Sequence, residues 1–128
     1  MDLYTYYRST SSYRVRIALA LKGLEVNAIP VNLIRDGGEH RKPDYLAINP
    51  QGRVPALRLD PGEVITQSMA IIEYLEESAP VPALLPTDLF QRARHRAVAA
   101  LIGCDIHPLH NVAVLNRLRG LGHDEGQV

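Results

Sequence analysis

The sequence has 128 residues, enough for one domain with a hydrophobic core but short for two complete domains. Hydrophobic residues make up 46% and charged residues 22%, as in ordinary globular proteins, and no uninterrupted apolar run approaches the roughly 18 residues of a membrane span. The 14 basic and 14 acidic side chains balance, so neither nucleic acid nor a membrane is an expected partner. The single cysteine, Cys104, excludes a disulfide within the chain. The N-terminus lacks the pattern of a secretory signal, and we expect a cytoplasmic protein.

The first elements follow from hydrophobic patterning. Residues 3–7 are apolar and aromatic and end at the polar residues 8–12, which predicts a strand that leads into a helix. Residues 13–22 carry apolar side chains at helical spacing, so they form that helix. Residues 26–33 predict a second strand, and the polar, glycine-rich residues 35–43 predict a long loop without regular structure.

A hairpin and a further helix complete this part of the chain. Residues 54–59 and 64–66 flank a turn, which predicts two antiparallel strands. Ser68 then begins a helix with an apolar stripe and acidic residues on its other side. The order βαβ followed by ββα is typical of an α/β, thioredoxin-like fold with a four-stranded mixed sheet.

The remainder of the chain is expected to be helical. Residues 79–86 contain three prolines and predict a semi-rigid linker between residues 1–78 and residues 87–128. Asp88 can cap a long helix, which Pro108 would kink. Because one helix cannot bury its own apolar stripe, we expect residues 87–128 to be the first helices of an incomplete all-helical domain.

Five motifs, in order along the chain, resemble those of the zeta-class glutathione transferases, the family of the maleylacetoacetate isomerases. They are YRSTSSYRVRIAL at 7–19, NLIRDGG at 32–38, NPQGRVP at 49–55, QSMAIIEYLEE at 67–77 and IHPLHN at 106–111. Any one of them would be a weak signal, but together they keep their order and spacing up to about Leu118. The resemblance implies a thioredoxin-like, glutathione-binding domain followed by the start of an all-α glutathione-transferase C-terminal domain.

Ser9 is the candidate catalytic residue. A thiol bound where the first strand meets the first helix would face a hydroxyl donor and the positive end of the helix, and both favour the thiolate. Residues 9–12 taken alone are better explained as helix caps, and the other motifs reverse that preference. The resemblance implies that Ser9 activates glutathione with Ser11 beside it, where the family usually has cysteine. Arg8 is the nearest cation for a substrate carboxylate, although a surface arginine lying over Tyr7 explains it as well.

The resemblance also implies which residues bind glutathione. Gln67 and Ser68 would hold the γ-glutamyl end at a helix N-terminus, and Ser68 alone would be an ordinary cap. Val54, joined to Pro55 by a cis peptide bond, would pair with the cysteinyl backbone. His40 would reach the glycine end, although a solvated loop histidine is nearly as consistent. The remaining expected contacts are Thr10, Ser11, Ser12, Tyr13 and Arg14 in the first helix, and His107 and Asn111 at the wall between the domains.

The expected activity is a glutathione-dependent cis–trans isomerisation of maleylacetoacetate, a small diketo acid, with glutathione as the cofactor and a homodimer as the full-length form. Maleylpyruvate isomerase and a glutathione transferase acting on α-halo acids are close alternatives. A truncated glutathione-binding fragment without turnover is the alternative of another class. No metal site is predicted, because His107 and His110 supply only two ligands.

Overall fold

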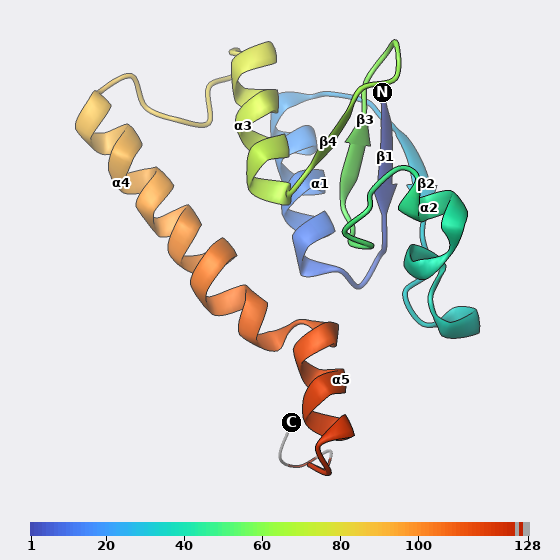
Figure 1. Ribbon diagram of the computed structural model, residues 1–128. Coiled ribbons are helices and arrows are strands. Elements are labelled where there is room, and N and C mark those ends of the chain that lie inside the picture. The colour runs from blue at the N-terminus through green and yellow to red at the C-terminus, as the bar shows by residue number, and fades with distance from the viewer. Residues whose placement is uncertain (125, 127–128) are drawn as a thin grey trace. The chain divides into compact units, whose positions relative to one another are not determined.

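The computed structural model describes residues 1–124 and 126 of the chain (Figure 1). It divides into two compact units, Met1–Leu85 and Pro86–Val128. The boundary lies inside the proline-containing segment 79–86. Whether residues 87–128 belong to a larger all-helical domain stays a prediction.

The first unit is built on a four-stranded sheet in the order β2-β1-β3-β4. These strands are β1 (Asp2–Thr5), β2 (Asn27–Pro30), β3 (Ala56–Arg58) and β4 (Val64–Thr66). β1 pairs in parallel with β2 and antiparallel with β3, and β3 pairs antiparallel with β4. The predicted mixed sheet and the thioredoxin-like fold class are therefore confirmed, with strands shorter than the apolar runs that predicted them.

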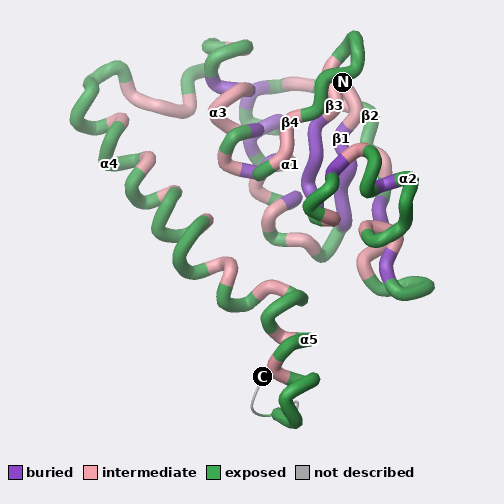
Figure 2. Tube along the Cα trace, in the orientation of Figure 1, coloured by how far each residue is buried: buried purple, intermediate pink, exposed green. Residues whose placement is uncertain are grey.

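Two helices cover one face of this sheet, α1 (Thr10–Lys22) and α3 (Ser68–Ser78) (Figure 1). They pack against each other, and the main core between helices and sheet includes Leu3, Val15, Leu57, Ile71 and Leu75. Figure 2 shows buried segments, in purple, along both the strands and the helices of this unit. Because successive strand residues point to opposite faces, Tyr4 and Ala56 instead pack with Tyr45 on the other face. The two faces of the sheet therefore contact separate hydrophobic clusters.

The loop after β2 contains more regular structure than its composition predicts. It forms 3₁₀ turns at Arg35–Gly37 and Glu39–Arg41 and a short helix, α2 (Pro43–Leu46). The turns are closed by local bonds, from the N–H of Gly38 to the carbonyl of Arg35 and from that of Lys42 to Glu39. Such bonds need no apolar periodicity, so the sequence pattern missed them.

The second unit begins with α4 (Leu89–Ala100), capped by Asp88 as predicted, since its carboxylate accepts the N–H of Gln91 at 2.8 Å. A π-helical turn, Leu101–Ile106, and a 3₁₀ turn, His107–His110, follow before α5 (Val112–Gly120). Pro108 lies in this irregular stretch, where its missing N–H leaves the carbonyl of Cys104 without an α-helical partner. The predicted interruption at Pro108 is thus confirmed.

The run Leu89–Gly120 is long and apolar enough to cross a membrane, the one such run among residues 1–124 and 126. This run contains no uninterrupted apolar stretch of that length, because Asp105, His107 and Asn111 lie among its apolar residues. This corrects the expectation that no segment would qualify. Length and composition alone are a weak indication, since core helices of proteins pass the same test.

Candidate functional site

Ser9 lies between β1 and α1 and caps the helix. Its Oγ accepts a hydrogen bond from the N–H of Ser12 at 3.2 Å, and its own N–H donates to the carbonyl of Tyr6 at 3.0 Å. The cap uses Oγ as an acceptor, so it does not use the hydroxyl hydrogen. Ser9 can therefore cap α1 and still donate a hydrogen bond to an anion at the same helix N-terminus.

The neighbours of Ser9 differ in their accessibility. Thr10 and Tyr13 are exposed, Ser11 is half-buried, and Arg8 on the preceding loop is exposed. Ser12 is fully buried, and its Oγ has no hydrogen-bond partner. The Ser12 side chain is closed off from solvent, and its expected contact with glutathione stays a prediction. The Ser12 side chain is buried, whereas its backbone N–H donates a hydrogen bond to Oγ of Ser9.

The beginnings of α1 and α3 are joined directly. Nη1 of Arg14 donates to Oγ of Ser68 at 3.2 Å, across 54 positions of sequence. Gln67, just before α3, has a positive φ of 69° and makes no side-chain cap to the helix. A positive φ is uncommon outside glycine and often marks a functional position. Without that cap, the N-terminus of α3 can accept a carboxylate.

The loop before β3 contacts the residue that precedes α3. Oε1 of Gln51 accepts a hydrogen bond from Nε2 of Gln67 at 2.7 Å. Gln51 was not among the site residues expected from the sequence. Its position in a resembling motif, exposed beside Gly52, is the signal that could have identified it.

Two buried side chains hold the backbone of this loop. Nδ2 of Asn49 donates to the carbonyl of Arg53 at 2.7 Å, and the Tyr45 hydroxyl donates to the same oxygen at 2.6 Å. Asn49 is 1% exposed, and burial raises the pKa of Tyr45 to about 12, so its phenol remains a donor. Val54 follows directly, and its peptide bond to Pro55 is cis, as predicted. No periodicity in the sequence marks Tyr45 or Asn49 for this task.

His40 lies in a tightly packed turn. Gly38 has a φ of 96°, and a Cβ there would come within 2.3 Å of Cε1 of His40, so only glycine fits. A Cβ at Gly52 would lie 3.1 Å from the His40 carbonyl, which places this turn against the loop of Gln51. Nδ1 of His40 is buried without a partner, and burial, with a smaller effect of Arg41, lowers the pKa of the imidazole. A neutral ring offers a ligand a hydrogen bond but no charge.

His107 and Asn111 belong to the second unit, and their role at a site stays a prediction. Asn111 caps α5, and its Oδ1 accepts the N–H groups of Ala113 and Val114 at 3.0 and 3.2 Å. Its side-chain oxygen therefore already serves the helix. Among residues 1–124 and 126, no group of three or more His, Cys, Asp or Glu side chains is placed to hold a metal ion.

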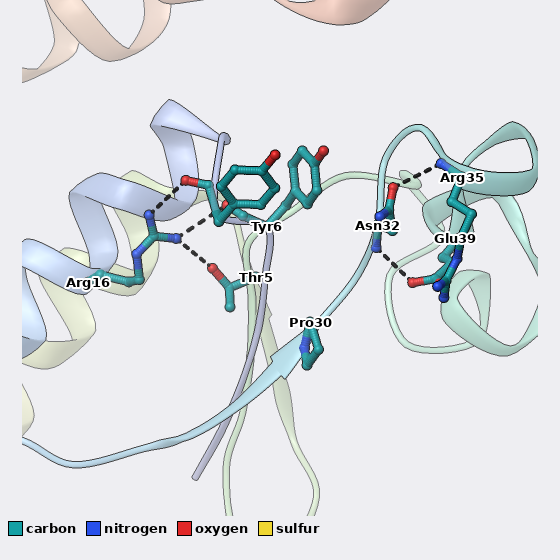
Figure 3. A pocket seen from close by; sticks show the side chains of 8 residues that line it. Thr5, Tyr6, Arg16, Pro30, Asn32, Arg35 and Glu39 are labelled. Atoms are coloured by element: carbon teal, nitrogen blue, oxygen red, sulfur yellow. Dashed lines mark hydrogen bonds and ion pairs between the residues drawn. The ribbon is translucent and has the colours of Figure 1, made fainter.

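A cavity of about 560 Å³ lies beside the β1–α1 loop, on the side of β2 (Figure 3). Its walls include Thr5 at the end of β1, Tyr6 and Tyr7 in the loop after β1, Arg16 in α1, and Asn32 and Glu39 in the loop after β2. None of its lining residues is a site residue expected from the sequence. It is therefore separate from the joined helix starts, although Tyr7 immediately precedes Arg8.

Comparison with known proteins identifies close relatives. The chain is 74% identical over all 128 residues to maleylacetoacetate isomerase of Pseudomonas aeruginosa, and covers 60% of that protein. It is 50% identical over 116 residues to maleylacetoacetate isomerase of Rattus norvegicus, with 91% of the chain and 53% of the relative covered. The chain therefore spans between about half and three-fifths of the length of these relatives.

Solved structures of related isomerases also resemble this chain. The holo structure of a maleylpyruvate isomerase, described as a bacterial zeta-class glutathione S-transferase, matches with a TM-score of 0.93 and 49% identity, covering 99% of this chain and 59% of that one. A maleylacetoacetate isomerase from Methylobacterium extorquens AM1, with bound malonate and GSH, also matches with a TM-score of 0.93, at 43% identity and the same coverage. The family model for the glutathione S-transferase N-terminal domain matches residues 8–78, more than half of the chain. The chain therefore belongs to the glutathione S-transferase family.

Proposed function

We propose that this chain is the glutathione-binding and thiol-activating part of a maleylacetoacetate isomerase. The observation that carries the proposal is the 74% identity to the Pseudomonas aeruginosa isomerase, which extends over all 128 residues and so includes every element of the candidate site. The cytoplasmic location and the homodimer expected from the family resemblance remain predictions.

The arrangement of donors fits glutathione. Ser9 would face the sulfur, and the uncapped start of α3, with Gln67 and Ser68, would hold the γ-glutamyl carboxylate. The backbone of Val54 would pair with the cysteinyl residue, and His40 would lie toward the glycine end. The hydrogen bond from Arg14 to Ser68 supports this arrangement, because it connects α1, which Ser9 caps, to the start of α3. The residues proposed to bind the sulfur and the γ-glutamyl group are therefore held in a fixed relation to each other.

When bound, glutathione supplies a thiolate that adds reversibly to a conjugated cis double bond, which can then rotate as a single bond and re-form as trans. The residues of this chain prepare that thiolate. The Ser9 hydroxyl and the positive end of α1 stabilise negative charge on the sulfur, which lowers the pKa of the thiol. Exposed Arg8, adjacent to Ser9, offers a cation to a substrate carboxylate.

A maleylpyruvate isomerase is the second candidate. The chain is 50% identical over 130 aligned positions to the maleylpyruvate isomerase of a Ralstonia species, an alignment that covers 100% of this chain and 59% of that protein. A glutathione transferase acting on α-halo acids also fits a thiol-activating site. Ser11, in place of the usual family cysteine, bears on the rate for each substrate.

The decisive experiment compares substrates. Purified protein with glutathione is assayed spectrophotometrically on maleylacetoacetate, maleylpyruvate and dichloroacetate, and glutathione binding is measured separately by titration calorimetry. We expect the largest kcat/KM for maleylacetoacetate and its loss in Ser9→Ala. Binding of glutathione with no turnover of any substrate would instead support a binding module and overturn the isomerase proposal.

A further inference from the structure

We infer that Arg16 is a positioning residue for Ser9, an inference that rests on the proposed function. Nη1 of Arg16 donates to Oγ1 of Thr5 at 2.9 Å and to the carbonyl of Tyr6 at 3.2 Å (Figure 3). Nη2 donates to the carbonyl of Tyr7 at 3.2 Å. One guanidinium therefore holds two consecutive carbonyl groups of the loop that leads from β1 to Ser9.

The link to Ser9 passes through a single oxygen atom. The carbonyl oxygen of Tyr6 accepts from Nη1 of Arg16 and also from the N–H of Ser9, at 3.0 Å. Ser9 and Arg16 are seven residues apart, which is two turns along one face of α1. Arg16 is anchored in α1, and its guanidinium holds the Tyr6 carbonyl in place by a hydrogen bond. That carbonyl in turn accepts the N–H of Ser9 and so positions the Ser9 backbone.

The partners of Arg16 indicate that its fork shape matters more than an ion pair. No carboxylate of residues 1–124 and 126 lies within ion-pair distance of Arg16. Its other described contact is with the ring of Tyr13, whose centroid is 5.3 Å from Cζ. Arginine presents several donors in a rigid plane, whereas a lysine ammonium on a flexible chain cannot reproduce that fork. Lysine would therefore restore the charge without restoring the position of the loop.

The cavity beside the loop makes a direct test possible. Arg16 forms part of its wall, and Tyr7, on the same wall, is 75% exposed, so solvent reaches the cavity. Replacing Arg16 with alanine would extend the cavity to the two carbonyl groups. A free guanidinium ion could then enter and donate to the same acceptors.

The experiment compares wild type, Arg16→Ala and Arg16→Lys, with Arg58→Ala as the matched control. Arg58 lies in β3 and pairs with Asp2, away from the β1–α1 loop. The thiol of bound glutathione is titrated by ultraviolet difference spectra, and exchange of the Ser9 amide hydrogen is measured without glutathione. We expect both Arg16 variants to raise the apparent thiol pKa by about one unit, a tenfold loss of thiolate.

Comparing kcat with the glutathione Kd distinguishes misplacement of Ser9 from a loss of glutathione binding. In both Arg16 variants we expect kcat to fall by about 10- to 100-fold through misplacement of the donor, while the glutathione Kd changes less than about threefold. The Ser9 amide should exchange faster, since its acceptor is no longer held. Millimolar guanidinium, far below denaturing concentrations, should restore Arg16→Ala but not Arg58→Ala, and sodium chloride should restore neither.

Two results would overturn the inference: normal thiol titration and Ser9 exchange in Arg16→Ala, or full recovery of both in Arg16→Lys. If the alanine variant does not fold, Thr5→Val decides, because it removes the 2.9 Å partner of Arg16 and should shift the thiol pKa in the same direction by less. An unchanged titration in Thr5→Val would then count against Arg16. If wild type itself lowers no thiol pKa, the proposed function fails and not only this inference.

Discussion

Nζ of Lys22 lies 2.6 Å from Oε2 of Glu76, and the lysine side chain has no exposure to solvent. The ammonium also donates to the carbonyl groups of Ala79 and Pro82, at 2.6 and 3.0 Å. The pair therefore ties α1 and α3 to the segment that follows α3. Residues 79–85 of the predicted linker belong to the first compact unit.

Removing one member of this pair should destabilise the first unit strongly. Lys22→Met leaves the Glu76 carboxylate buried without its cation, a loss of about 3–5 kcal/mol for a pair of this kind. Urea unfolding of wild type and variant measures it. Arg35→Met, which removes the exposed pair between Arg35 and Glu39 on the surface, is the control and should leave the midpoint nearly unchanged. Equal effects of the two variants would contradict the prediction.

The same pair predicts a pH dependence of stability. Burial raises the pKa of Glu76, but the hydrogen bonds from Lys22 and from the N–H groups of Leu84 and Leu85 outweigh it and hold the pKa below its ordinary 4.5. A depressed carboxyl pKa contributes stability above the unfolded value, and this is lost as pH falls through the folded value. Unfolding free energies should thus differ between wild type and Glu76→Gln at pH 7 and converge below about pH 4.5. A constant difference down to pH 3 would exclude this role.

Gln67 allows strain and ligand contact to be separated. Gln67→Ala and Gln67→Gly both remove the side-chain amide and should weaken glutathione binding equally, by about 1–3 kcal/mol. Only glycine adopts the positive φ of this position freely, so the glycine variant should be more stable than the alanine variant by about 1 kcal/mol. Calorimetry and urea unfolding measure the two effects. Wild-type affinity in both variants would remove Gln67 from the site.

Ser9→Ala should move the thiol titration of bound glutathione toward the free value of about 8.5. Affinity for glutathione should change little, because the hydroxyl acts on the sulfur. Ser12→Ala is the matched control in the same helical turn: it removes a buried hydroxyl without a partner and should leave the titration unaltered. Identical thiolate titrations in Ser9→Ala and wild type would refute the role of Ser9.

The two hydrogen bonds to the Arg53 carbonyl allow a prediction about which side chain holds the loop before Val54. Asn49→Ala removes a buried donor and should lower stability by about 1–3 kcal/mol. It should also weaken glutathione binding, because Asn49 holds the loop at two points: its Nδ2 donates to the Arg53 carbonyl, and its Oδ1 accepts the N–H of Gln51 at 3.1 Å. Tyr45→Phe leaves Asn49 donating to the same oxygen, so its effect on binding should be smaller. The reverse order of the two affinities would show that Tyr45, and not Asn49, holds the loop.

The fold of the first unit and the position of Ser9 could be predicted from local sequence patterns alone. The apolar and aromatic run at residues 3–7, the helical spacing in 13–22 and the turn between 54–59 and 64–66 are local patterns that can be recognised along the chain. The capping position of Ser9 is equally local, because a cap acts within one turn of its helix.

The side-chain contacts that connect the elements of the site could not be predicted from the sequence. The contacts of Arg14 with Ser68 and of Gln51 with Gln67 join residues 54 and 16 positions apart. The burial of Ser12 depends on which way α1 is turned against the sheet. Such contacts arise when separately formed elements pack on one core, and periodicity along the chain carries no information about partners that meet only after packing.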